Sequence, residues 1–323
     1  MKYYLAPMEG ITGYIYRNAY HSCFRPMDKY ITPFLAPKKN SGFSTREKED
    51  VLLQHNQGAY TVPQILTNRA EDFLKAACEL RDMGYQEINL NLGCPSPTVT
   101  AKGKGAGFLG NPQELRAFLE QIFPVLEKEH IELSIKTRLG VSEPEEFAGL
   151  LSLYNEFPVK ELIVHPRVLT DYYKNGPNLG AFLTAVQQAS FPVCYNGNLF
   201  MPDAVSRLKE EIPQLNLVML GRGVLMNPFL TEQMEKKEPG ADAKKRLEQF
   251  HSMIYEGYRR VMPGERPVLF KMKELWSYQM RLFTDDGSYM KQIRKAQRLS
   301  QYETAVKSVF RSLELDFTGE RRA

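Results

Sequence analysis

Residues 89–107, which read NLNLGCPSPTVTAKGKGAG, place a cysteine where a run of alternating apolar residues ends. Cys94 stands between a glycine and a proline, and Lys102 and Lys104 follow in a glycine-rich stretch. A thiol with a pKa of about 8.5 is largely protonated at neutral pH and can donate a proton as a general acid. Neighbouring ammonium groups lower a thiol pKa and favour a nucleophilic thiolate instead. The position predicts a reactive thiol rather than an inert buried one, and leaves open whether Cys94 is an acid or a nucleophile.

Polar side chains also stand at the ends of other short runs rich in β-branched and aromatic residues. They are Gln64, Asn91, Lys136, Arg138, His165, Arg167 and Asn196. Lys136 and Arg138 are two residues apart, as are His165 and Arg167, so each pair faces one side of a strand. Burying polar groups costs free energy, so their accumulation at strand ends indicates a binding site.

Eight short runs can form the strands that position these side chains. They span residues 3–8, 30–35, 61–66, 87–93, 133–139, 161–166, 192–197 and 217–222. Helical patterns fill most of the gaps, for example 70–84, which ends in glycine, and 111–129, which begins with an asparagine cap and a proline. A doubly wound sheet also alternates strands and helices, but eight near-regular units favour closure. The sequence therefore predicts an α/β fold, a TIM (β/α)8 barrel, followed by a small all-α helical domain.

Glycines follow the seventh and eighth predicted strands. Gly197 lies between Asn196 and Asn198, and Gly221 precedes Arg222. Glycine lets backbone N–H groups approach an anion, and the loops after strands seven and eight form the usual phosphate site of this fold. A guanidinium adds a fork of donors.

Three side chains at the strand ends suit a flat, phosphorylated ligand. Lys136 can neutralise an anionic ring or phosphate, Gln64 can donate and accept hydrogen bonds, and His165 can donate to a carbonyl. Together with the phosphate loops, this set fits a cofactor such as FMN. The sequence GAGFLG at 105–110 matches a dinucleotide fingerprint, but it follows a loop and therefore predicts no Rossmann unit.

The last quarter of the chain is basic. Residues 240–323 hold 17 Lys and Arg against 11 Asp and Glu. The charged stretch 235–245, with Pro-Gly at its centre, reads as a linker, so we expect a barrel domain over 1–238 and a helical domain over 239–323. Surface lysines and arginines commonly just solvate helices, but this excess suits a phosphate backbone. The candidate contacts are Lys271, Lys273, Arg281, Lys291, Arg294, Lys295 and Arg298.

Composition excludes several other classes of protein. No apolar run is long enough to span a bilayer, and the first residues contain no signal-peptide core. The four cysteines have no metal-binding spacing, so no metal site is predicted. We expect a cytoplasmic monomer with no membrane association and no obligate protein partner.

These motifs resemble the tRNA-dihydrouridine synthase family, flavoproteins that reduce a uridine of tRNA. The resemblance covers almost the whole chain and rests on LAPMEGIT, PQI, NLNLGCPSP, IKTRLG, IVHPR, NGN and GRG, in that order. It implies that FMN is held by Ala6, Pro7, Met8, Gln64, Lys136, His165, Asn196, Gly197, Asn198, Gly221 and Arg222. NADPH or NADH would reduce the flavin in a separate half-reaction.

The resemblance also assigns roles toward a uridine of tRNA. It implies that Cys94 protonates C5 of the uracil while reduced FMN delivers hydride to C6. Asn91 and Arg138 match positions that face the uracil, and Arg167 and Tyr172 are further candidates. Two alternatives stay open, which are a flavin ene-reductase or dihydropyrimidine-type dehydrogenase acting on a free small molecule, and a non-catalytic RNA-binding factor.

Overall fold

The computed structural model describes residues 1–37, 42–285 and 287–318. Its sheet contains only parallel pairs, in the order β3-β2-β1-β9-β8-β7-β6-β5-β4. The strands are β1 (Lys2–Leu5), β2 (Lys29–Ile31), β3 (Thr61–Val62), β4 (Gln64–Ile65), β5 (Glu87–Leu92), β6 (Glu132–Arg138), β7 (Glu161–His165), β8 (Val193–Tyr195) and β9 (Leu217–Leu220). Each lies within or beside one of the eight predicted runs.

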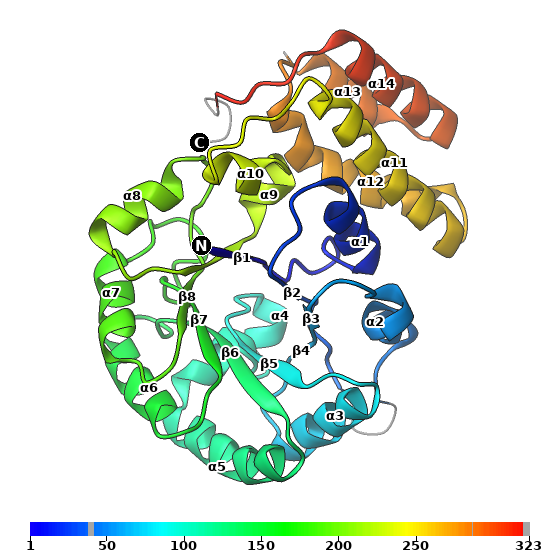
Figure 1. Ribbon diagram of the computed structural model, residues 1–323. Coiled ribbons are helices and arrows are strands. Elements are labelled where there is room, and N and C mark those ends of the chain that lie inside the picture. The colour runs from blue at the N-terminus through cyan, green and yellow to red at the C-terminus, as the bar shows by residue number, and fades with distance from the viewer. Residues whose placement is uncertain (38–41, 286, 319–323) are drawn as a thin grey trace. The chain divides into compact units, whose positions relative to one another are not determined.

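The two ends of this strand order are halves of one strand. β3 and β4 are separated only by Pro63, which has no backbone N–H to donate. β3 pairs with β2, and β4 pairs with β5, so the ring of strands closes through the Thr61–Ile65 segment. The predicted TIM-barrel architecture is confirmed (Figure 1).

Strand register identifies the side chains that point into the barrel. Ile163 on β7 packs in a buried cluster with Tyr4 on β1, Ala6 just after β1, Ile31 on β2, Cys194 on β8 and Met219 on β9. Ile163 is in register with Lys136, which in turn is in register with Asn91. Because side chains alternate along a strand, the interior also receives the residues two and four positions away. These are Glu87 and Asn89 on β5, Ser134 and Arg138 on β6, and Glu161 and His165 on β7.

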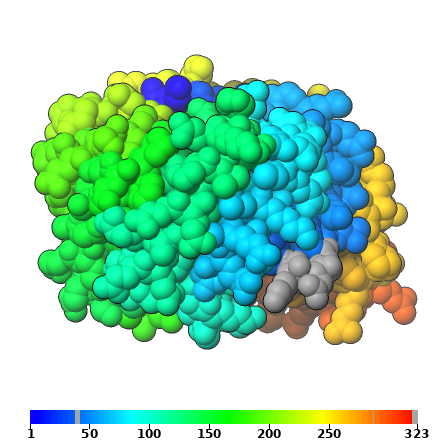
Figure 2. Space-filling view, turned by 90° about the horizontal axis from the view of Figure 1, so that it is seen from below, coloured from blue at the N-terminus to red at the C-terminus, as the bar shows by residue number. Residues whose placement is uncertain are grey.

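Helices pack on the outside of these strands (Figure 1). They are α2 (Thr45–Val51), α3 (Ala70–Asp82), α5 (Pro112–Lys128), α6 (Glu146–Asn155) and α7 (Leu179–Gln188). The short α4 (Pro97–Thr100) is seen within the ring of strands in the same view, and 3-10 turns occur at Leu53–His55 and Gly105–Gly110. The predicted cap of α5 is confirmed, since the Asn111 side chain accepts from the backbone N–H of Glu114 at 3.3 Å. Figure 2 shows the cyan-to-green segments of the chain side by side over one face.

The chain divides into two compact units. The first comprises 1–7, 28–198 and 209–219, and the second comprises 8–27, 199–208 and 220–323. The second unit carries α1 (Tyr14–Cys23), α9 (Arg222–Met226), α10 (Leu230–Met234), α11 (Ala243–Val261), α12 (Glu265–Gln279), a 3-10 turn at Met280–Leu282, α13 (Ser288–Lys295) and α14 (Leu299–Ser312), while α8 (Ala204–Glu211) spans the division at 208/209. Residues 235–242, between α10 and α11, lie where the linker is predicted. The predicted boundary after residue 238 stays a prediction.

The second unit has an aromatic core. Phe250, Ile254, Leu275 and Phe283 are buried, and Tyr258 is half-buried. The Nε1–H of Trp276 donates to the Tyr302 hydroxyl at 2.8 Å, and this hydroxyl lies 2.6 Å from Nε2 of His251. Burial lowers the pKa of His251 to about 4, so the imidazole is neutral at pH 7. In the described residues, no helix is both long and apolar enough to cross a bilayer.

Candidate active site

Four predicted site residues meet at the carboxyl end of neighbouring strands in the first unit. Asn91 on β5 is in register with Lys136 on β6, and Arg138 on β6 is in register with His165 on β7. Parallel strands bring their carboxyl ends to one rim of the barrel, which is where TIM-barrel active sites lie. The structure therefore brings these side chains together as the spacing of the sequence indicates.

Cys94 is held in a turn directly after β5. The Asn91 side-chain oxygen accepts from the backbone N–H of Gly93 at 3.1 Å and from that of Cys94 at 2.9 Å. The Cys94 carbonyl accepts from the backbone N–H of Ala106 at 3.0 Å. Cys94 is half-buried. Gly93 and Cys94 thus belong to a turn that the Asn91 side chain holds in place.

The glycine-rich loop after Cys94 folds back onto that turn. At Gly105, φ is +58°, and a Cβ would lie 2.8 Å from the Cys94 carbonyl oxygen. At Gly107, a Cβ would lie 2.7 Å from the carbonyl oxygen of Thr100. Both distances are shorter than a real Cβ tolerates, so these glycines are required for packing around Cys94. This explains Gly105 and Gly107 of the GAGFLG stretch without a dinucleotide.

Lys136 is a half-buried cation without an acidic neighbour in the described part of the chain. Its ammonium makes neither an ion pair nor a hydrogen bond with any described residue. Burial, together with the Arg138 guanidinium, lowers the pKa of Lys136 to about 8. The Cys94 and Cys194 sulfurs are close enough to act in the opposite direction as thiolates. Such a group gains most from an anionic ligand, because the ligand would supply the missing counter-charge.

Arg138 is fully buried and its guanidinium contacts backbone carbonyls. It donates to Gly93 at 3.0 Å, to Val168 at 2.9 Å and to Tyr172 at 3.1 Å. These bonds join the turn that carries Cys94 to the loop after β7. Tyr172, a weaker candidate from the sequence, has a φ of +49° and an exposed side chain. Its observed contribution to the rim is the backbone carbonyl.

His165 and Arg167 form a second pair at this rim. One Arg167 nitrogen lies 2.7 Å from Nε2 of His165, and another donates to the Asn198 side-chain oxygen at 3.2 Å. Because a guanidinium can only donate, Nε2 is the acceptor and the proton of neutral His165 sits on Nδ1. Arg167 thereby fixes the tautomer of the imidazole.

The remaining predicted cofactor residues lie in both units. In the first, Ala6 is buried and followed by Pro7, and the Asn196 amide donates to the Met219 carbonyl at 2.9 Å. A Cβ at Gly197 would lie 2.2 Å from the Tyr195 hydroxyl. In the second unit, Met8, Gly221 and Arg222 are half-buried, and Arg222 lies over the Phe200 ring at 5.1 Å. A role of these residues in binding FMN stays a prediction.

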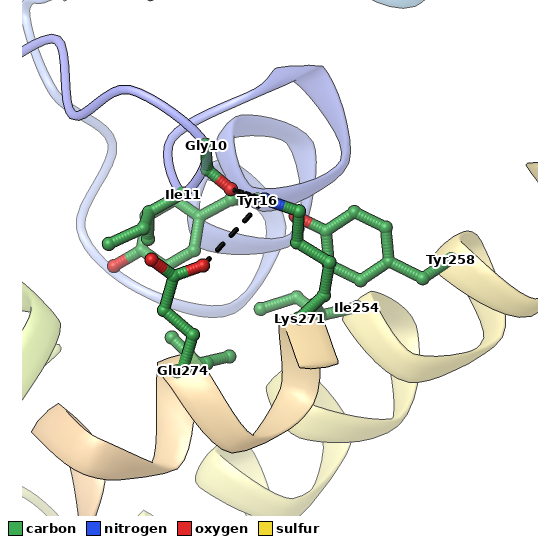
Figure 3. A pocket seen from close by; sticks show the side chains of 8 residues that line it. Gly10, Ile11, Tyr16, Ile254, Tyr258, Lys271 and Glu274 are labelled. Carbon is green, nitrogen blue, oxygen red and sulfur yellow. Dashed lines mark hydrogen bonds and ion pairs between the residues drawn. The ribbon is translucent and has the colours of Figure 1, made fainter. Parts of the chain in front are cut away.

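The basic candidates of the second unit differ in their environment. Lys271 on α12 donates to the Gly10 carbonyl and lies 3.6 Å from Glu274, which fixes it beside a pocket lined by Ile11 and Tyr16 (Figure 3). Lys273 donates to the Ala296 carbonyl. The side chains of the other five are exposed, and they are Arg281, Lys291, Arg294, Lys295 and Arg298.

Sequence reasoning overlooked three residues of the barrel interior and rim. Asn89 and Ser134 lie one layer below Asn91 and Lys136, and Gln64 bonds to both asparagines. Tyr173 lies 5.6 Å from the Arg138 guanidinium and 5.9 Å from the His165 ring. Alternation along β5 and β6 could have identified Asn89 and Ser134, whereas the loop position of Tyr173 carried no periodic signal. No cluster of potential metal ligands occurs among the described residues.

Structural comparison supports the barrel. Histamine dehydrogenase from Rhizobium sp. 4-9 superposes with a TM-score of 0.55 and 12% identity, over 78% of this chain and 49% of that chain. A morphinone reductase mutant in complex with tetrahydroNAD gives a TM-score of 0.51 and 13% identity, over 77% of this chain and 90% of that one. At such identities the likeness is one of fold.

Sequence comparison gives the family. A probable tRNA-dihydrouridine synthase 2 of Bacillus subtilis (strain 168) is 25% identical over 264 residues, which cover 79% of this chain and 78% of the relative. A probable tRNA-dihydrouridine synthase of Staphylococcus aureus (strain COL) is 27% identical over 258 residues, 75% of this chain and 73% of the relative. The sequence model described as dihydrouridine synthase matches residues 4–312. The chain therefore belongs to the dihydrouridine synthase family of flavin-dependent oxidoreductases, as its motifs indicate.

Proposed function

We propose that this protein is a tRNA-dihydrouridine synthase that uses FMN and NADPH to reduce the C5–C6 double bond of a uridine in tRNA. The observation that carries the proposal is the rim of the barrel, where a positioned Cys94 thiol lies within electrostatic reach of the Lys136 ammonium. The names of two relatives include this activity, and the match to this chain covers more than two thirds of the length of each.

The residues of the first unit fit FMN. The Lys136 ammonium, which has no carboxylate partner in the described chain, supplies a positive charge beside the ligand. Gln64 is buried and its amide is fixed by two asparagines, and His165 carries its proton on Nδ1. Ala6, Pro7 and the Asn196-Gly197-Asn198 turn complete the proposed contacts in this unit, and Met8, Gly221 and Arg222 stay predicted cofactor residues.

Bound FMN, once reduced, supplies a hydride. In the proposed reaction that hydride forms the new C–H bond at C6, and the Cys94 thiol gives its proton to C5. The hydride would bring the electron pair of the new C6–H bond, and the two electrons of the C5–C6 π bond would form the C5–H bond with the proton from Cys94. The resulting thiolate would be reprotonated from water. Asn91 orients the turn that carries Cys94, while Arg138 secures that turn to the loop after β7. A thiol fits this role because proton transfer to carbon needs a donor fixed in place.

The exposed basic side chains of the second unit suit the tRNA backbone. We assign Arg281, Lys291, Arg294, Lys295 and Arg298 to phosphate contacts. The ammonium groups of Lys271 and Lys273 are engaged with backbone carbonyls, which favours a structural contribution. The enzyme would act as a monomer in the cytoplasm, where unmodified tRNA is available, on a base that has left its stack.

The test is anaerobic re-oxidation of the NADPH-reduced protein by unmodified tRNA. We compare the wild type with Cys94→Ala and with Cys78→Ala, a matched control on the outer helix α3. Fast re-oxidation by tRNA, absent with free uridine, is expected for the wild type and the control. Loss of a general acid is expected to slow the Cys94→Ala reaction by about 10²–10⁴-fold.

Two results would replace this function. A flavin that NADPH reduces but tRNA does not re-oxidise would favour a reductase of small molecules. A colourless preparation that binds tRNA without flavin would favour a non-catalytic RNA-binding factor.

A further inference from the structure

We infer that Asn89 and Ser134 are positioning residues for Cys94, and that they act through a buried hydrogen-bonded chain, Ser134–Asn89–Gln64–Asn91, inside the barrel. This inference rests on the proposed function, since it extends the machinery of the same site by two residues. Neither residue lies at a strand end, where site residues are ordinarily sought.

The chain crosses three neighbouring strands. The Asn89 amide nitrogen donates to the Ser134 hydroxyl at 2.9 Å, and the Gln64 amide nitrogen donates to the Asn89 oxygen at 2.7 Å. The Asn91 amide nitrogen then donates to the Gln64 oxygen at 2.7 Å. The Asn91 oxygen finally accepts from the backbone N–H of Cys94 at 2.9 Å. Each member therefore orients the next one.

Backbone groups of known polarity stand at both ends of this chain. The N–H groups of Gly93 and Cys94 can only donate, so the Asn91 atom that faces them is its oxygen. Its nitrogen must then donate to Gln64, and the same logic passes through Asn89 to Ser134. At the far end the Ser134 hydroxyl donates to the Ile88 carbonyl, which can only accept, at 3.4 Å. All three amide orientations are thus determined by the backbone, and reversing one of them would set like atoms against each other.

Burial makes this arrangement stiff. Gln64, Asn89 and Ser134 are 0% exposed, and Asn91 is 6% exposed. Without water to replace a lost partner, a buried amide that turns leaves a donor or an acceptor unsatisfied. An apolar set of the same volume would stabilise the barrel as well. The particular result of this polar chain is a carboxamide oxygen fixed under the N–H of Cys94.

The inference predicts a selective defect when the distal end of the chain is cut. Ser134→Ala removes the acceptor of Asn89 without touching Cys94, Asn91 or Gln64. We expect re-oxidation of the reduced flavin by tRNA to slow by about tenfold, because catalysis is sensitive to small misplacements of a reacting group. Reduction of the flavin by NADPH should stay within about twofold of the wild type. Ser134→Thr, which keeps the hydroxyl, should restore the tRNA reaction.

The rate of Cys94 alkylation by iodoacetamide in the FMN-loaded protein provides an independent readout. We expect this rate to change in Ser134→Ala and to return to the wild-type value in Ser134→Thr. Equal slowing of both half-reactions, or rates like the wild type in both half-reactions, would overturn the inference. If tRNA does not re-oxidise even the wild type, the proposed function fails, and the alkylation rate alone then decides: no change in Ser134→Ala overturns the positioning role.

Discussion

The two ends of the barrel contain lysines in opposite surroundings. At the amino end, Lys29 begins β2 and pairs with Glu87, which begins β5, at 2.9 Å and with Glu161, which begins β7, at 3.1 Å. At the carboxyl end, Lys136 pairs with no carboxylate among the described residues. Burial acts to lower the pKa of both lysines, but the carboxylates of Glu161 and Glu87 outweigh it at Lys29, whose pKa is raised. At Lys136 nothing comparable opposes burial, and its pKa falls to about 8.

The difference between Lys29 and Lys136 indicates that one end of the barrel interior serves stability and the other serves ligand binding. At the amino end, the Tyr4 hydroxyl also donates to Glu161 and the Tyr60 hydroxyl donates to Glu87, both within 2.8 Å, so the buried charges are compensated by the protein itself. At the carboxyl end no described carboxylate compensates Lys136, and we propose that the bound cofactor does so. In TIM barrels the amino face serves stability and the carboxyl face serves function. Lys29 and Lys136 are an example of each.

The largest expected effect is at the amino end. Lys29→Met leaves Glu87 and Glu161 buried together without their shared cation, and such a loss costs about 3–5 kcal/mol. Urea unfolding should show this drop in the free energy of unfolding, while the FMN affinity of the folded protein stays near that of the wild type. A loss below about 1 kcal/mol would mean that Lys29, Glu87 and Glu161 behave like an exposed ion pair. The contrast between Lys29 and Lys136 would then fail.

At the carboxyl end the pattern should reverse. Lys136→Met removes an uncompensated charge, so the free energy of unfolding of the apoprotein should stay unchanged or rise. FMN affinity should fall by about 10–100-fold, the value of a charge-assisted hydrogen bond in a buried site. Fluorescence titration with FMN measures this, with Lys75→Met on the exposed face of α3 as the control. Unaltered affinity in Lys136→Met would remove Lys136 from the cofactor site.

His251 is a third way of burying a basic side chain, since it stays neutral. Its pKa falls from 6.5 to about 4 on folding, so between these values the unfolded chain binds a proton that the folded chain does not. Stability from this residue is therefore present above pH 6.5 and is lost as the pH falls, by at most about 1.4 kcal/mol per pH unit. Thermal unfolding between pH 7 and 5 should depend less on pH in His251→Gln than in the wild type or in His130→Asn, an exposed control. Equal pH dependence in all three would contradict the assignment.

The smallest expected effect is on the salt dependence of tRNA binding. It distinguishes an exposed cation of the second unit from one that is hydrogen-bonded within the protein. Arg294→Met should reduce the slope of log K against log salt for tRNA binding by about one, because one phosphate contact is lost. Lys271→Met should leave that slope unchanged, since its ammonium is occupied by the Gly10 carbonyl and Glu274. A reduced slope in Lys271→Met would restore this lysine to the RNA-binding surface.

Most of the fold could be predicted because barrels repeat a simple pattern. All eight runs became strands, since β-branched and aromatic residues bounded by helical patterns leave few alternatives. The interruption at Pro63, which splits one strand into β3 and β4, follows from its missing N–H. The division into compact units, in which residues 8–27 group with the C-terminal helices, depends on contacts between distant segments that no local pattern encodes.

The sequence predicts which residues form the candidate site better than it predicts the contacts that they make. The strand-end rule found Asn91, Cys94, Lys136 and His165, but it gave no indication that Arg138 would bond to three backbone carbonyls. The sequence alone indicates that Lys271 is a surface charge, because its hydrogen-bond acceptor, the Gly10 carbonyl, lies far away in the chain. Partners of this kind are set by tertiary structure, so spacing alone predicts which residues gather but not which hydrogen bonds they make.

The most direct test of the contrast between the two lysines is proton uptake when FMN binds the apoprotein at pH 8. Calorimetric titration in two buffers of different ionisation enthalpy gives the number of protons taken up. At a pH equal to its pKa, Lys136 is half protonated, and an anionic ligand that restores its charge should take up about half a proton. Lys136→Met should take up none, and Lys29→Met should behave like the wild type. Binding of FMN to the wild type without proton uptake would contradict the account, because the charge at the carboxyl end would then not be the one that the cofactor compensates.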